Sequence, residues 1–172
     1  MILLKKLLSE SLDTPYKYSH SFKTELIDEE DEETGEIYKK EVLSPVQIVK
    51  FKTEDGIPYL WYARQARYND TAWNMAFGVE TGIGYKGEHQ LDIGITKTGH
   101  AARVFSTVID IINSFINFDD AGHEIRFLIF TAKEKNRSKF YINRVVPRIE
   151  NFKIDYIKND PDETEITLVR TN

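Results

Sequence analysis

Apolar residues recur every three or four positions from Ala101 to Phe118, the strongest periodic segment of the chain. This spacing predicts a helix with one broad buried face. Before it, Leu91, Ile93 and Ile95 alternate with polar residues, as in a strand with one buried side. Gly99 lies between the two segments. We therefore expect a strand, a glycine-containing turn and a long buried helix over residues 89–118.

Other alternating or aromatic-rich runs predict further strands, and a second helix follows the central one. The Asp55-Gly56 pair between two such runs is a hairpin signal, and Phe140, Tyr141, Val145 and Ile149 would face inward from the second helix. The fold class that follows is α+β, with a single mixed, mostly antiparallel sheet and helices packed on it. The expected strands are 16–27, 46–52, 57–64, 72–80, 89–96, 125–130, 152–157 and 163–170, and the second helix is 133–149.

The N-terminus has a different pattern. Leucines at positions 3, 4, 7 and 8 form one stripe of a short amphipathic helix, which Asp13-Thr14-Pro15 would end. Two lysines interrupt the apolar run, so it does not resemble a secretion signal, and no apolar run approaches the roughly 20 residues that span a bilayer. We expect an N-terminal helix over 1–15 and one soluble domain over 16–172, without a membrane partner.

Composition and charge make some kinds of partner and site unlikely or impossible. The formal net charge is −5 and the pI about 5.4, which makes nucleic acid an unlikely partner. There are no cysteines, so disulfides and thiolate metal sites are impossible. The histidines, His20, His89, His100 and His123, show no metal-ligand spacing.

Two charged segments remain. Six acids run from Asp28 to Glu33, and such a run is more often a solvated hairpin tip than a magnet for a basic partner or a cation. The second predicted helix is basic, with Lys133, Lys135, Arg137, Lys139, Arg144 and Arg148. It is either a solvated face or a surface for an acidic partner, including the acidic loop of another copy.

The order of predicted elements resembles the GCN5-related N-acetyltransferase superfamily. In that family the strands on either side of a central helix splay apart, and backbone amides of the turn before the helix hold the pyrophosphate of acetyl-coenzyme A. Gly99 and Ala101 match the family pattern at this turn, whereas Thr96 replaces the usual Gln or Arg. The resemblance implies a coenzyme site made of Lys97, Thr98, Gly99, His100, Ala101 and Ala102.

The family also places a tyrosine, often the general acid, on the helix after the fifth strand. Tyr141 has that place, but Arg137 replaces the usual small residue and Glu134 the usual Asn, and the Gly-Phe that follows is absent. Glu80 and Asp92 are candidate bases toward an acceptor amine. A tyrosine on a helix is more often part of a core than catalytic, and His100 is more often an ordinary residue at a helix start.

Several short strings carry a narrower resemblance that covers more of the chain: Leu7–Glu10, Pro15-Tyr16, Thr98-Gly99, Ala102–Val108, Phe130–Glu134 and Arg137–Tyr141. They resemble uncharacterised proteins of tailed bacteriophages. The resemblance implies a phage product with an acetyltransferase-like fold, in the virion or the host cytoplasm, and no established activity.

Two hypotheses follow. The first is a phage protein that acts by binding a protein partner, such as another virion protein or a second copy of itself, and that needs no cofactor. The second is an active N-acetyltransferase that uses acetyl-coenzyme A. Whether the chain is an enzyme stays open at this point.

Overall fold

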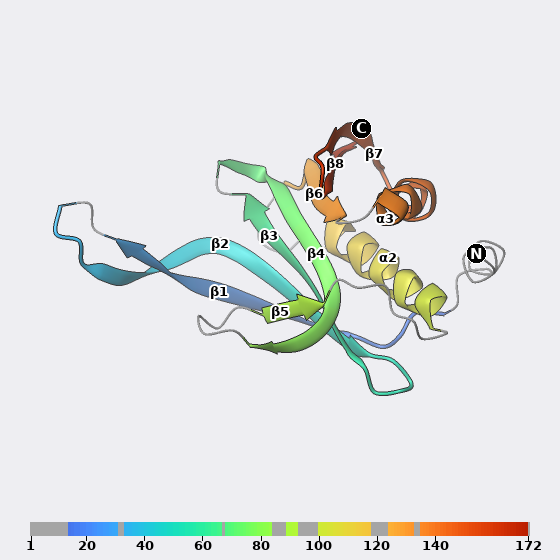
Figure 1. Cartoon of the computed structure of the whole chain (residues 1–172), viewed down its shortest axis with the longest axis horizontal. Helices are drawn as coiled ribbons and strands as arrows, with labels where there is room; N and C mark the ends of the chain where they lie inside the picture. The colour runs from blue at the N-terminus through green and yellow to red at the C-terminus, as the bar shows by residue number, and fades with distance from the viewer. Residues whose placement is uncertain are drawn as a thin grey trace.

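The computed structural model describes residues 14–30, 33–66, 68–83, 89–92, 100–117, 124–132 and 135–171. Their strands form one sheet in the order β1-β2-β3-β4-β6-β8-β7, with β5 paired to β4 outside this path (Figure 1). The predicted α+β class with one mixed, mostly antiparallel sheet is confirmed. The strands are β1 Ser19–Glu30, β2 Ile37–Lys52, β3 Pro58–Ala66, β4 Asn69–Ile83, β5 His89–Asp92, β6 Phe127–Ala132, β7 Phe152–Asn159 and β8 Thr164–Arg170.

Strands β2, β3 and β4, which cover the expected strands 46–52, 57–64 and 72–80, form an antiparallel meander. Its first turn uses the Asp-Gly signal: Gly56 has φ +77°, a conformation that glycine adopts without steric cost. The Gly56 amide donates to the Thr53 carbonyl at 2.9 Å, and the Ile57 amide donates to Thr53 Oγ1 at 3.1 Å. This turn therefore fixes where β2 ends and where β3 begins.

Strand β4 is the branch point of the sheet. Ala72 to Met75 pairs in parallel with β6, whereas Val79 to Ile83 pairs in antiparallel fashion with β5. A parallel pair requires a crossover, and α2 (Ala101–Asn117) supplies it. The strand expected over 89–96 is present as β5, but residues 93–99, which contain the expected glycine turn, lie outside the described residues.

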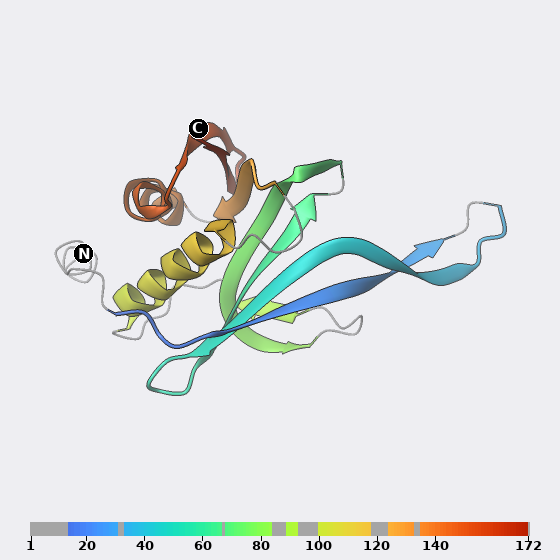
Figure 2. The same cartoon turned by 180° about the vertical axis from the view of Figure 1, so that it is seen from behind.

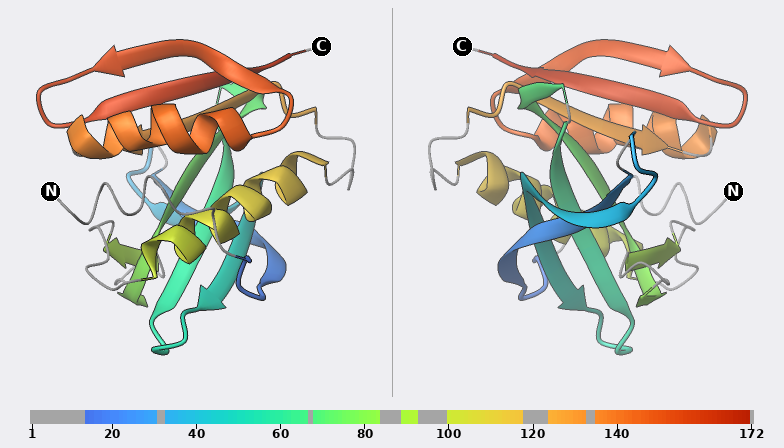
Figure 3. Two further views of the ribbon diagram at one scale, coloured as in Figure 1. Left: turned by 90° about the vertical axis from the view of Figure 1, so that its right-hand side faces the viewer. Right: turned by 90° about the vertical axis from the view of Figure 1, so that its left-hand side faces the viewer.

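The helix α2 crosses one face of the sheet (Figure 3). Its predicted apolar stripe is buried, and Phe115 packs edge-on against Trp61 of β3 and Trp73 of β4, with centroid distances of 5.4 and 5.1 Å. Burying a side chain of this size contributes about 1.5–3 kcal/mol. The main core therefore lies between α2 and the sheet.

The second helix changes its winding along its length. An α-helical part, α3 (Lys135–Phe140), continues as a π-helical turn, η1 (Tyr141–Val145), and a 3-10 turn, η2 (Val146–Arg148). Pro147 explains the change, because it has no N–H to donate and its ring crowds the carbonyl four residues earlier. The single helix expected over 133–149 is thus one helical segment with three geometries. Tyr141, Val145 and Ile149 are buried as predicted, and Phe140 is half-buried.

The outer part of the β1–β2 hairpin, residues 24–45, pairs only with itself in the described structure. Strand β3 pairs with β2 from Val46 onward, so nothing in the described chain extends the sheet beyond that residue. We call residues 24–45 the arm and the remaining described residues the body. The arm projects away from the body in both opposite views (Figures 1 and 2).

The predicted hairpin tip for the acidic run is confirmed where the structure describes it. Asp28 to Glu30 end β1, and Glu33 and Thr34 form a turn. Residues 31 and 32 lie outside the described residues, as does the expected N-terminal helix up to residue 13. Among the described helices, none has the length and apolar character needed to cross a membrane.

Candidate functional site

A cavity of about 300 Å³ lies where β4 and β6 stop pairing. Their register ends at Met75 and Phe130, yet both strands continue, β4 to Ile83 and β6 to Ala132. Two strands that continue without hydrogen bonds between them leave room for side chains and for a ligand. The lining comprises Trp61, Tyr62, Asn74, Met75, Ala76, Phe77, Val108, Ile112, Ile129, Phe130, Thr131, Tyr141, Val145 and Glu163.

The cavity reaches both faces of the sheet. Phe77 and Phe130 lie on the helix-covered face, because each packs edge-on against Tyr141, at 6.1 and 5.6 Å between centroids. Successive residues of a strand point to opposite faces, so Ala76 and Thr131 belong to the other face. The cavity therefore has an apolar, aromatic interior on the α2 side. The exposed Asn74 and Thr131 add polar groups on the opposite side, and the exposed Glu163 also lines the cavity.

Tyr141 is part of the cavity wall. It is 7% exposed and begins the π-helical turn, and Val145 at the end of that turn also lines the cavity. Single π-helical turns occur often at functional sites. Its ring also meets Phe105 of α2 at 6.2 Å between centroids. Tyr141 is thus both a core residue and the predicted site residue that reaches the cavity.

Glu80, the predicted base, lies elsewhere. It faces Leu91 in the β4–β5 pairing, and its carboxylate accepts a hydrogen bond from Lys50 Nζ at 2.7 Å. It is not among the cavity-lining residues. The other candidate base, Asp92, pairs with Val79 at the same end of β4. The structure therefore does not bring Glu80 and Tyr141 together in the cavity.

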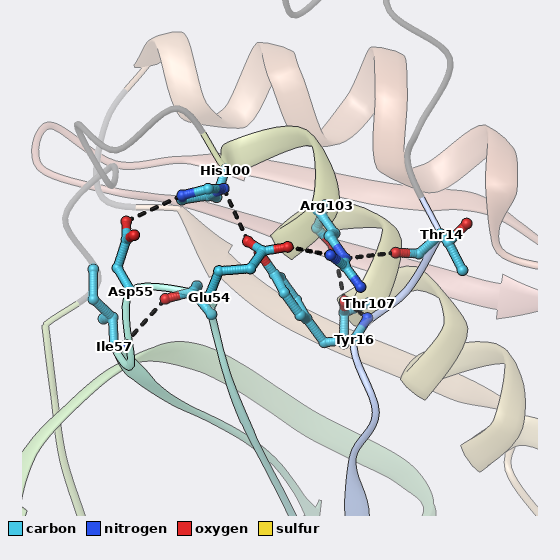
Figure 4. Close-up of polar contacts among 9 residues, drawn as sticks. Thr14, Tyr16, Glu54, Asp55, Ile57, His100, Arg103 and Thr107 are labelled. Atoms are coloured by element: carbon cyan, nitrogen blue, oxygen red, sulfur yellow. Dashed lines mark hydrogen bonds and ion pairs between the residues drawn. The ribbon is translucent and has the colours of Figure 1, made fainter.

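A second polar site lies at the start of α2 (Figure 4). His100 lies between two carboxylates of the β2–β3 turn: Nδ1 is 3.1 Å from Glu54 Oε2, and Nε2 is 3.0 Å from Asp55 Oδ2. Arg103, one turn along the helix, also donates to Glu54 through Nη1. Four charged or titratable side chains from two distant segments meet here.

The segment before β1 joins this cluster. Arg103 Nε donates to the Thr14 carbonyl at 2.9 Å, and its guanidinium carbon lies 4.1 Å from the centre of the Tyr16 ring. The Tyr16 hydroxyl donates to Glu54 Oε2 at 2.6 Å, and the Tyr16 amide donates to Thr107 Oγ1 at 2.8 Å. We call Tyr16, Glu54, Asp55, His100, Arg103 and Thr107 the anchor cluster.

Its electrostatics follow from these contacts. Burial and the hydrogen bond to Glu54 raise the pKa of Tyr16 to about 12. The same hydrogen bond, followed by the Arg103 and His100 charges, holds the pKa of the Glu54 carboxyl below its usual value despite some desolvation. Glu54 therefore stays ionised under mildly acidic conditions, and Tyr16 stays protonated under mildly alkaline ones.

The described residues include the second half of the predicted coenzyme turn. Lys97, Thr98 and Gly99 lie outside the described residues, whereas Ala101 and Ala102 are each 5% exposed within the first turn of α2. His100, the predicted ligand between them, already faces two carboxylates. A diphosphate at this helix start would meet Glu54 and Asp55, and like charges repel.

Sequence reasoning missed most of the anchor cluster. The sequence pattern places Glu54 and Asp55 only in a turn. It places Tyr16 in a strand and Arg103 in a helix. No local pattern connects residues that lie 38 and 49 positions apart. Within the described chain, no group of three or more acidic or histidine side chains has the geometry to hold a metal ion.

Comparisons with known proteins give no match to any family model, curated protein or solved structure. The likenesses to acetyltransferases and to phage proteins thus stay predictions.

Proposed function

We propose that this chain is a bacteriophage protein with an acetyltransferase-like fold that acts by binding another protein through its arm, without acetyl transfer. The partner offers a basic surface, either on another virion protein or on a second copy of this chain. The place of action is the virion or the host cytoplasm. The arrangement of β4, α2 and β6 supports the fold assignment, because two parallel strands separate beside a central helix, as the resemblance implies.

The observation that carries this proposal is the isolated arm. It is a two-stranded ribbon beyond the reach of β3, and an isolated two-stranded hairpin is marginally stable in water. Residues 24–45 include nine acidic and two basic residues, a formal charge of −7, whereas the rest of the chain sums to +2. A projecting ribbon with this charge gains both order and electrostatic complementarity from a basic partner.

The anchor cluster supports binding over catalysis. Glu54 and Asp55 of the β2–β3 turn lie on both sides of His100, at the helix start that would hold the coenzyme diphosphate. The predicted base Glu80 is bound by Lys50 away from the cavity. These contacts support binding over acetyl transfer.

The direct test places a photo-reactive benzoylphenylalanine at Ile37, which is 71% exposed on the arm, or at Tyr156, which is 54% exposed on the body. The protein is irradiated in cells that produce the phage. We expect one discrete protein adduct from position 37 and none from position 156. Combined Asp28→Asn, Glu29→Gln and Glu30→Gln changes should abolish that adduct. Equal labelling from both positions would contradict binding through the arm.

The cavity favours a second candidate, an active N-acetyltransferase that uses acetyl-coenzyme A. Lys97 to Ala102 would hold its pyrophosphate, and Tyr141, which lines the cavity, would act as the acid. This candidate predicts a thermal shift with acetyl-coenzyme A that Gly99→Asp removes. It also predicts that Tyr141→Phe lowers kcat without unfolding the chain. Absence of any thermal shift would exclude it.

A further inference from the structure

The second helical segment concentrates positive charge. Its parts α3, η1 and η2 run from Lys135 to Arg148, and we call these residues the basic segment. Five basic residues and no acidic residue give it a formal charge of +5, whereas the arm carries −7 and the rest of the chain −3. The five are Lys135, Arg137, Lys139, Arg144 and Arg148. The arm and the basic segment are thus two separate elements with large charges of opposite sign.

One side of the basic segment is buried and the other is open to solvent. Tyr141 and Val145 are buried against the core. Lys139 and Arg148 are exposed, and Arg144 is half-buried. Among the ion pairs of the described residues, none involves these three cations. Within the described chain, therefore, no carboxylate neutralises the outer side of this segment.

The end of the basic segment is held on α2. Asn113 Nδ2 donates to the Arg148 carbonyl at 3.0 Å, and the Glu150 amide donates to Asn113 Oδ1 at 2.9 Å. Arg148 Nη1 donates to the Arg144 carbonyl at 2.6 Å, which keeps the two arginines together. A partner thus meets cations on a backbone that is already ordered, and this lowers the cost of binding.

The arm of the same copy points away from the basic segment. It leaves the body on the side opposite α3 (Figures 1 and 2). The sheet order agrees, because β1 and β2 of the arm lie at one end of the sheet and β7, which follows the basic segment, lies at the other. The arm of one copy can therefore meet only the basic segment of another copy.

We propose that the basic segment of one copy binds the acidic arm of a second copy. This inference rests on the proposed function, because it uses the arm, and it names the surface that the arm recognises. Complementary charges steer two proteins toward each other and fix how they meet. Since the contact joins two different surfaces, two copies either exchange arms or leave one arm and one basic segment for further copies.

Sedimentation equilibrium of the full chain tests this inference, at about 0.1 mM protein so that a weak contact is still populated. In about 0.1 M sodium chloride we expect a mass about twice the 20.0 kDa of one chain, or more. At about 1 M, where the screening length falls from about 10 Å to about 3 Å, the mass should return to that of one chain. The mass of a single chain at both salt concentrations would overturn the inference, and so would an assembly that salt does not weaken.

Charge reversal on the basic segment should have the same effect as salt. Lys139→Glu combined with Arg148→Glu should leave the protein as single chains in about 0.1 M sodium chloride. Lys17→Glu combined with Lys52→Glu is the matched control, because it reverses two charges at exposed residues of the body. The control should assemble like the unchanged protein, and equal loss of assembly in both variants would overturn the inference.

A mixture of two variants distinguishes a lost surface from a misfolded chain. The first carries Asp28→Asn, Glu29→Gln and Glu30→Gln, so its arm is weakened and its basic segment is intact. The second carries Lys139→Glu and Arg148→Glu, so its arm is intact. Each alone should have the mass of one chain, and an equal mixture should form a pair of about twice that mass. No pair in a mixture of variants that each unfold cooperatively would overturn the inference.

Cross-linking from position 37 separates this inference from the proposed function. An adduct that maps to residues 135–148 of a second copy supports both. An adduct with a different protein, and none with a second copy, overturns the inference and leaves binding through the arm in place. No adduct at all contradicts both.

Discussion

The body and the arm are built from the same sheet but are held in different ways. In the body, α2 covers the sheet, and Trp61, Trp73 and Phe115 pack together with at most 4% of each residue exposed. In the arm, β1 and β2 pair with each other and with no third strand of the described chain. Burial therefore stabilises the body, whereas within the described chain the strands of the arm pair only with each other.

The largest effect is expected in the body core. Phe115→Ala removes a ring packed between two tryptophans and should cost about 3–5 kcal/mol of unfolding free energy. Ile37→Ala on the arm, where 71% of the residue is exposed, should change it by less than about 0.5 kcal/mol. Urea unfolding measures both, and similar losses would remove the distinction between arm and body.

The contacts between α2 and the segment before β1, which we call the junction of arm and body, should make an intermediate contribution to the free energy of unfolding. Thr107 is fully buried, accepts the Tyr16 amide hydrogen at 2.8 Å and donates to the Arg103 carbonyl at 2.8 Å. Thr107→Val leaves both groups without that partner and should cost about 1–3 kcal/mol. Thr107→Ser keeps the hydroxyl and is the control. Equal stability of the valine and serine variants would show that these bonds do not hold the junction.

The same junction predicts behaviour at high pH. Since folding raises the pKa of Tyr16 to about 12, its contribution to stability is complete below about pH 10 and is lost as the pH rises toward 12. An absorbance titration at 295 nm, the tyrosinate band, should lose a late-titrating component in Tyr16→Phe. Tyr68→Phe, at a residue that is 92% exposed, is the control. An unchanged late component in Tyr16→Phe would mean that Glu54 and burial do not hold the Tyr16 proton.

Sequence alone predicts the features that depend on residues close together in the chain, and it does not predict those that depend on distant residues. The α2 stripe, the Asp55-Gly56 turn and the meander follow from local periodicity and turn chemistry, and all are present. The parallel pairing of Ala72 with Phe127 joins residues more than fifty positions apart in the chain, and no local pattern specifies it. The π-helical turn at Tyr141 arises from Pro147, whose effect on winding was not anticipated.

The residues of the candidate site show the same difference between local and long-range contacts. Tyr141 was identified from its place on a helix, and it does reach the cavity. Glu80 was identified from its place beside the expected cleft, but Lys50 of β2, on the far side of β3, binds it instead. The Tyr16–Glu54–Arg103 contacts were missed because three separate segments contribute one residue each.

The smallest effect is expected from removing the arm. Replacing residues 24–45 by Asn-Gly joins Lys23 to Val46, which already face each other in register, through a two-residue turn. We expect the shortened chain to fold with a Tm within about 4 °C of the full chain, since no third strand of the described chain pairs with the arm. Differential scanning calorimetry measures the change. Loss of cooperative unfolding would show that the arm is part of the folding unit.

The central claim is that this scaffold works by binding and not by acetyl transfer, and isothermal titration of the full chain with acetyl-coenzyme A tests it most directly. Glu54 and Asp55 beside His100 predict no saturable heat up to about 1 mM, a limit that corresponds to about 4 kcal/mol of binding free energy. Saturable binding at micromolar concentration, lost in Gly99→Asp and followed by acetylation of an amine, would contradict the account.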